Sequence, residues 1–82
     1  MSEADTRRQL TALLREILED QSVDPQVDDS DDDIPGFDSG AKLQLLMAVE
    51  ERLGIRLRSR EVDGLRRFGD WVVLIHRRQA TG

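Results

Sequence analysis

The stretch DSGAKLQLLMAVEERLG, residues 38–54, contains the clearest helix start and stop signals of this chain. Asp38 and Ser39 are both residue types that cap the N-terminus of a helix. Gly54 is the residue type that most often ends one, since glycine adopts the left-handed backbone conformation without strain. The segment between them is rich in leucine and contains no proline. It predicts a helix over residues 39–53.

Two faces can be distinguished on this predicted helix. At about 100° per residue, one stripe collects the apolar side chains expected in the core, which are Leu45, Leu46, Val49 and Leu53. Leu43 and Met47 lie about 100° from the centre of that stripe, on a side shared with Gly40, Glu50 and Glu51. The pattern leaves two interpretations open. A small bundle buries Leu43 and Met47 as filler, which periodicity slightly favours, or the two form an apolar spot ringed by acids where a partner protein docks.

The rest of the sequence predicts helices around this one. Apolar residues at three-and-four spacing predict a first amphipathic helix over residues 5–20. Residues 60–66 favour a short third helix and residues 69–78 a last helix. We find no strand pair and no internal repeat in the sequence. The expected fold class is all-α: a small four-helix bundle, with three main helices plus a short third helix, and a long loop between helices 1 and 2.

The long loop, with its prolines and many acids, needs apolar side chains to hold it to the core. Four residues are expected to do so: Val23, Val27, Ile34 and Phe37. After the second helix, Ile55 and Leu57 alternate with arginines and are expected to turn inward. The last helix places four large side chains on one face: Phe68, Trp71, Val72 and Ile75.

Composition limits the function. Residues 1–82 are expected to form one domain, and the absence of cysteine excludes a disulfide framework, a thiolate metal site and a cysteine nucleophile. No apolar run approaches the roughly 20 residues of a membrane helix, and the polar N-terminus is unlike a secretion signal. We therefore expect a cytoplasmic protein without membrane insertion.

The net charge of -5 hides an asymmetry along the chain. Between Glu19 and Asp38 there are nine acids and no base, whereas between Arg52 and Arg67 there are six arginines. Nucleic acid is disfavoured as a partner, because its phosphates would meet the acidic field and few aromatic side chains are present for bases to stack on.

Two chemical interpretations of the loop fail on spacing. Counted from Asp29, acids occupy the first, third and fifth positions of a calcium loop, but Ile34 replaces its glycine and Gly40 its final glutamate. We expect a solvated charge run and no metal site. The order G-x-x-S-G differs from the hydrolase elbow G-x-S-x-G. His76, the only histidine, is expected at the surface near a helix C-terminus and not as a base for Ser39, so we expect no catalytic residues and no enzyme.

Residues 38–75, DSGAKLQLLMAVEERLGIRLRSREVDGLRRFGDWVVLI, resemble the second half of an acyl carrier protein. In that family an Asp-Ser-Leu motif opens an apolar, acid-flanked second helix, which is followed by a short third helix and a final helix. The first helix and the long loop match in kind, so the resemblance covers nearly the whole chain. The motif is short, and its place at the head of the apolar helix makes it specific.

The resemblance implies a role for Ser39. In the family, a phosphopantetheinyl transferase uses coenzyme A and magnesium to attach 4'-phosphopantetheine to the motif serine, and the aspartate before it, here Asp38, helps to hold the magnesium. An acyl- or aminoacyl-loading ligase and downstream transferases or synthases then use the arm, which bears cargo as a thioester. The implied protein is a monomeric, non-catalytic phosphoprotein of fatty acid or secondary metabolite biosynthesis.

Departures from the family pattern lie around the docking face. Gly40 stands where leucine is usual, Lys42 and Gln44 occupy positions that are often acidic, and three arginines flank the short third helix: Arg56, Arg58 and Arg60. Because partners select carriers by charge complementarity, these changes indicate a specialised biosynthetic pathway. Two alternatives stay open. The chain is an aminoacyl or peptidyl carrier, or it is an unmodified helical adaptor that binds a partner through Leu43 and Met47.

Overall fold

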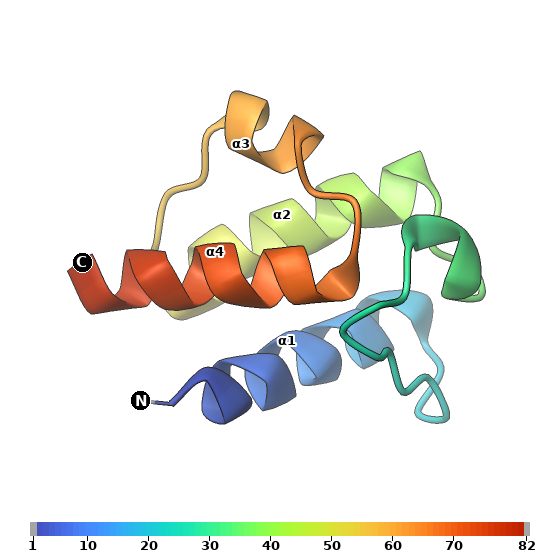
Figure 1. Ribbon diagram of the computed structural model, residues 1–82. Coiled ribbons are helices and arrows are strands. Elements are labelled where there is room, and N and C mark those ends of the chain that lie inside the picture. Colours follow the sequence, from blue (N-terminus) through green and yellow to red (C-terminus); the bar gives the residue numbers. More distant parts are fainter. Residues whose placement is uncertain (1, 82) are drawn as a thin grey trace.

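The computed structural model describes residues 2–81, which form helices joined by loops (Figure 1). Helix α1 spans Glu3–Leu18, α2 Ser39–Leu53, α3 Ser59–Asp63 and α4 Phe68–Thr81, and a single 3-10 turn, η1, covers Asp31–Asp33. In this part of the chain the only β-type pairing is an isolated bridge between Ser30 and Arg67. The predicted all-α bundle with a long first loop and a short third helix is confirmed.

Helix α1 begins and ends two residues before the predicted bounds of 5–20. Its start is fixed by a capping box, in which the Ser2 hydroxyl accepts from the Asp5 amide and the Asp5 carboxylate accepts from the Ser2 amide, each at 3.2 Å. Its end is fixed by Glu19, which takes the left-handed conformation with φ of 52°. Local capping thus outweighs the hydrophobic pattern at both ends.

The last two helices also differ from their predicted bounds. Helix α3 stops at Asp63 instead of residue 66, where the Gly64 amide closes the final turn on the Glu61 carbonyl. Helix α4 starts one residue earlier than predicted and continues beyond residue 78. The second helix has the predicted bounds, with Asp38 as its N-cap and Gly54 in the left-handed conformation after its last turn.

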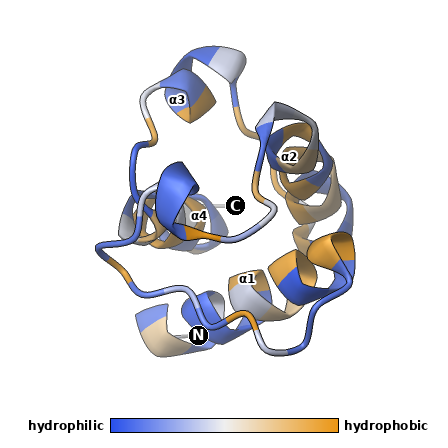
Figure 2. Ribbon diagram, turned by 90° about the vertical axis from the view of Figure 1, so that its right-hand side faces the viewer, coloured by the Kyte–Doolittle hydropathy of each residue, from blue (hydrophilic) through white to orange (hydrophobic). Residues whose placement is uncertain are grey.

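The core lies where α1 packs against α2 and α4, and Figure 2 shows apolar stretches of these helices around the shared interior. Of the predicted stripe on α2, Leu45 and Val49 are buried, whereas Leu46 and Leu53 are only partly buried. All four predicted residues of α4 are buried, and Ile55 and Leu57 turn inward as expected. No helix among residues 2–81 is both long and apolar enough to cross a membrane.

The loop between α1 and α2 is held by side chains and by backbone. Val23, Ile34 and Phe37 are buried as predicted, but the prediction for Val27 is wrong, since its side chain is 46% exposed. Its backbone carbonyl makes the contact instead, accepting from the Gly69 amide at 2.9 Å. The Phe68 amide donates to the Asp29 carbonyl at 2.8 Å. Because these amides belong to the first turn of α4, the loop backbone caps that helix.

Candidate functional site

Ser39 is an exposed first residue of α2, and its neighbours leave helix donors open beside it. The Asp38 side chain accepts from the Ala41 amide at 2.8 Å, and the Asp38 carbonyl accepts from the Lys42 amide at 2.9 Å. Within residues 2–81, the amides of Ser39 and Gly40 have no hydrogen-bond acceptor. A negatively charged group on the Ser39 oxygen would meet these donors and the positive end of the helix dipole.

His76 lies at the other end of the bundle from Ser39. Figure 1 shows the start of α1 beside the end of α4, with the start of α2 at the opposite end. The His76 Nδ1 atom is 3.4 Å from the Thr6 hydroxyl, which also donates to Gln79 Oε1 at 2.8 Å. His76 is thus only partly exposed at the surface, because its ring lies against the fully buried Thr6.

The second face of α2 is a surface feature and not filler. Leu43 is 57% exposed and Met47 is 60% exposed, so burial, which periodicity slightly favoured, is wrong. Gly40 and Glu51 are exposed on the same helix. Two large exposed apolar side chains, one and two helical turns after Ser39, are suited to contact with another protein.

Glu50 has a structural contact that the sequence did not indicate. Its carboxylate accepts from the Leu57 amide at 3.0 Å, and the residue is half-buried. The contact ties the segment after α2 back to the helix. A carboxylate hydrogen-bonded to the backbone seven residues later has no sequence signature, because the path of the intervening turn determines it.

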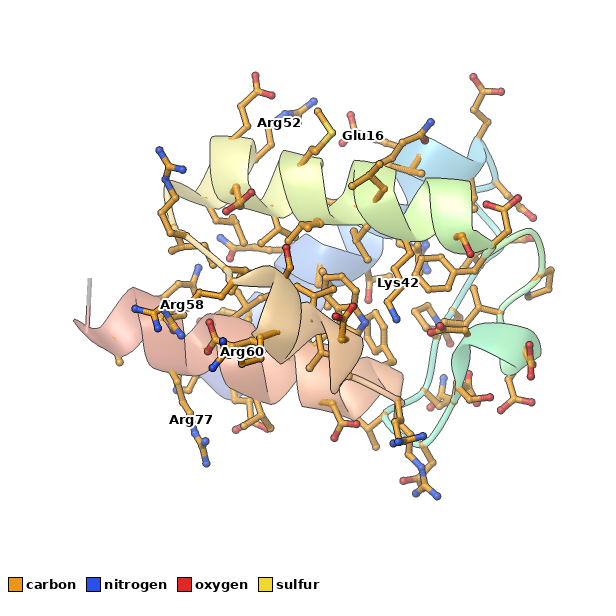
Figure 3. The ribbon with its side chains drawn as sticks, turned by 90° about the horizontal axis from the view of Figure 1, so that it is seen from above. Glu16, Lys42, Arg52, Arg58, Arg60 and Arg77 are labelled. Atoms are coloured by element: carbon orange, nitrogen blue, oxygen red, sulfur yellow. The ribbon has the colours of Figure 1, made fainter. Side chains whose placement is uncertain are left out.

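Several carboxylates of the acidic loop make local contacts. Lys42 of α2 lies 3.5 Å from the Asp31 carboxylate of η1 and so links the helix to the loop (Figure 3). The Asp33 carboxylate accepts from the amide and the hydroxyl of Ser30, and these hydrogen bonds hold the pKa of Asp33 below its ordinary value. In the described part of the chain, no three histidine, cysteine, aspartate or glutamate side chains gather into a group that could hold a metal ion.

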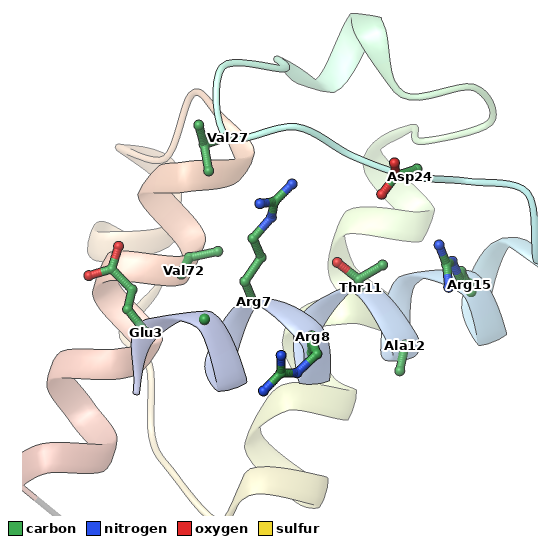
Figure 4. A pocket seen from close by; sticks show the side chains of 10 residues that line it. Glu3, Arg7, Arg8, Thr11, Ala12, Arg15, Asp24, Val27 and Val72 are labelled. Carbon is green, nitrogen blue, oxygen red and sulfur yellow. The ribbon is translucent and has the colours of Figure 1, made fainter. Parts of the chain in front are cut away.

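An open groove of about 740 Å³ separates α1 from the loop (Figure 4). Arg7 and Arg15 of α1 reach into it and donate to loop carbonyls, those of Pro25 at 3.3 Å and Val23 at 2.7 Å. Ser39 is not among the lining residues, so the groove lies apart from the candidate site. The two arginines hold the loop in place, which sequence reasoning did not anticipate.

The fold has a solved relative. The solution structure of the holo acyl carrier protein from Geobacter metallireducens is similar to this chain, with a TM-score of 0.86 and 26% sequence identity. The match covers 93% of this chain and 87% of that one. No protein-family description and no curated protein matches the sequence. The two chains share one fold along almost their whole length.

Proposed function

We propose, from the premise that this chain has the fold of the acyl carrier protein family as its sequence predicted, that it bears acyl intermediates as thioesters on a 4'-phosphopantetheine arm attached to Ser39. The observation that carries the proposal is the exposed hydroxyl of Ser39 at the head of α2, in a chain whose fold matches that of a holo acyl carrier protein. The protein is a carrier and leaves the chemistry to its partner enzymes.

Attachment is a phosphoryl transfer that a phosphopantetheinyl transferase performs. The Ser39 oxygen forms a bond to the phosphorus next to pantetheine in coenzyme A, the pyrophosphate bond breaks, and adenosine bisphosphate leaves as the serine proton passes to a base of the transferase. The arm supplies the thiol that the chain lacks. Asp38 suits a role in holding the transferase magnesium, because one of its carboxylate oxygens binds the Ala41 amide and the other has no partner within residues 2–81.

Partner enzymes dock beside Ser39 on a face that includes Leu43, Met47 and Glu51. The exposure of the two apolar side chains supports this surface. We expect the cargo to be an acyl group of a specialised pathway, with an aminoacyl or peptidyl group as the alternative, and the protein to act in the cytoplasm. The same exposure also favours a second candidate function, an unmodified adaptor that binds a protein through Leu43 and Met47.

In vitro modification separates the two candidates. Wild-type protein is incubated with coenzyme A, magnesium and a broad-specificity phosphopantetheinyl transferase, and its intact mass is measured. A carrier gains the mass of one phosphopantetheine, Ser39→Ala gains none, and the control Ser59→Ala, altered at an exposed serine that opens α3, behaves as wild type. Absence of any gain, under conditions that load another carrier protein, would support the adaptor.

A further inference from the structure

Three exposed arginines form a positive surface on this acidic protein. We call Arg56, Arg58 and Arg60, which lie before and within α3, the arginine edge. None of their side chains is in an ion pair with a residue in the described range 2–81. Other basic residues of the chain do have acidic partners, as Arg52 does in Glu16 and Arg67 in Asp28. Because all three residues are exposed, the edge presents most of its charge to solvent.

Glu61, the nearest acid in sequence, offsets only part of the charge of the edge. Glu61 accepts from the Arg58 backbone amide at 3.1 Å and forms an ion pair with Arg78 of α4. The pKa of Glu61 is below its ordinary value, first because of the Arg58 amide, then because of the Arg78 guanidinium, and also because of the positive charge of Arg58. The carboxylate is thus engaged mainly by α4, and the following acid, Asp63, forms no ion pair with the edge within residues 2–81.

The edge and Ser39 lie toward opposite ends of α2. The helix has 15 residues, so its ends are separated by about 22 Å. Ser39 and the acidic loop are at its start, and the edge follows its end. Figure 3 shows Arg58 and Arg60 toward one end of the molecule and Lys42, which contacts the loop, toward the other. The candidate docking face on α2 thus lies between a negative pole, the acidic loop near Ser39, and a positive pole, the arginine edge.

We propose that the arginine edge is a docking surface for an acidic patch on a partner enzyme, and that it disfavours enzymes whose carrier-binding face is basic throughout. The proposal rests on the proposed function, because the partner has to reach Ser39 while it contacts the edge. A partner that is basic near its active-site entrance and acidic about 20 Å away complements both poles and is fixed in orientation. Like charges facing each other cost affinity and association rate, which provides the discrimination.

Other polyanions fit the molecule less well. A nucleic acid or an anionic membrane presents one sign of charge over a long distance, and the acids of the loop repel it. Only three arginines are available in the edge, whereas phosphate binding at physiological salt gains its strength from many contacts. A protein surface with a compact acidic patch can contact the arginine edge without coming close to the acids of the loop, which would repel it.

The first test compares two triple variants of the whole chain with equal net charge. The edge variant is Arg56→Glu/Arg58→Glu/Arg60→Glu, and the control is Arg8→Glu/Arg66→Glu/Arg67→Glu, altered at exposed arginines elsewhere. The probe is a phosphopantetheinyl transferase chosen for a basic carrier-binding face, and the readout is kcat/KM for the mass gain on Ser39. At about 25 mM NaCl we expect the edge variant to exceed the control about tenfold, and at about 500 mM NaCl the difference should vanish. Equal values at low salt would overturn the proposal.

The second test does not depend on Ser39. A glutamate-rich peptide is titrated into the labelled wild-type protein, and amide chemical shifts are followed by NMR. We expect changes centred on residues 56–60, with none in the edge variant. Changes elsewhere, or tighter binding of a short DNA duplex or of phosphatidylglycerol vesicles by the same residues, would overturn the proposal. If no transferase modifies the wild-type protein, the proposed function is wrong. The peptide titration still tests whether the arginine edge binds an acidic surface.

Discussion

The Asp38 carboxylate accepts a hydrogen bond from the Ala41 amide at 2.8 Å, so the residue before the candidate attachment serine also caps α2. One carboxylate oxygen accepts the capping hydrogen bond, and the other is available to bind a magnesium ion of the transferase. The cap needs only an oxygen acceptor, whereas magnesium binding needs a carboxylate. Substitution can therefore separate the two roles.

Asp38→Asn should keep the cap and lose the carboxylate. We expect its free energy of unfolding to stay within about 0.5 kcal/mol of wild type, whereas Asp38→Ala loses about 1 kcal/mol. Both variants should be modified slowly by the transferase, because neither offers magnesium a carboxylate. Urea unfolding and the rate of mass gain provide the measurements. Wild-type modification rates in Asp38→Asn would leave Asp38 with the capping role alone.

Gly40 is not required by the backbone at its position. An added Cβ would meet only the Asp38 carboxylate, at an ordinary 3.5 Å, and the residue is helical. We expect Gly40→Ala to stabilise the protein by up to about 1 kcal/mol, since glycine is the poorer helix former. Gly54→Ala is the matched control, and it should destabilise because Gly54 has φ of 65°. Destabilisation by Gly40→Ala in urea would contradict the described geometry.

Gly69 allows the loop to approach α4 closely. A Cβ at this position would lie 2.9 Å from the Val27 carbonyl oxygen, the atom that accepts from the Gly69 amide. Gly69→Ala should push the loop away and cost about 1–3 kcal/mol of unfolding free energy. Gly64→Ala is the control, because its Cβ would have only an ordinary contact at 3.6 Å. Equal stabilities of the two variants in urea would show that the loop does not cap α4 as described.

Acid should weaken the fold partly through Glu61. Its pKa is lowered from an ordinary value of 4.5 by the Arg58 amide and by Arg78, so the native state binds the proton less readily than the unfolded chain. The resulting stability is fully present above pH 4.5 and is lost as the pH falls through the lower, native value. Glu61→Gln should therefore lose less stability than wild type between neutral pH and about pH 3.

The control for this pH dependence is Glu51→Gln, changed at an exposed carboxylate on α2. We expect it to follow the wild-type pH profile in urea or thermal unfolding. A Glu61→Gln profile parallel to wild type would contradict the lowered pKa of Glu61.

The sequence predicted α2 accurately because its signals are local. An acceptor side chain at Asp38 and a glycine at Gly54 determine where the helix begins and ends, whatever packs against it. The inward turn of Ile55 and Leu57 followed from simple alternation. The position of Ser39 at the head of α2 was predictable for the same reasons, and its modification stays a prediction.

Features that depend on tertiary contacts were missed or misjudged. Val27 is apolar and was expected in the core, yet only its backbone contacts α4. Periodicity could not decide whether Met47 is buried, because that depends on whether another segment packs against its side of α2, and Met47 is 60% exposed. The burial of Thr6 depends on Gln79, which lies far along the chain. No local pattern reports such pairings.

The attachment of an arm to Ser39 can be read from the mass of the protein purified from its own source. We expect a mass increase of one phosphopantetheine, located on the peptide that contains Ser39, with an acyl or aminoacyl thioester on part of the material. Cargo and attachment site are thus identified in one measurement. Native protein that consistently has an unmodified Ser39, from cells with an active phosphopantetheinyl transferase, would contradict this expectation.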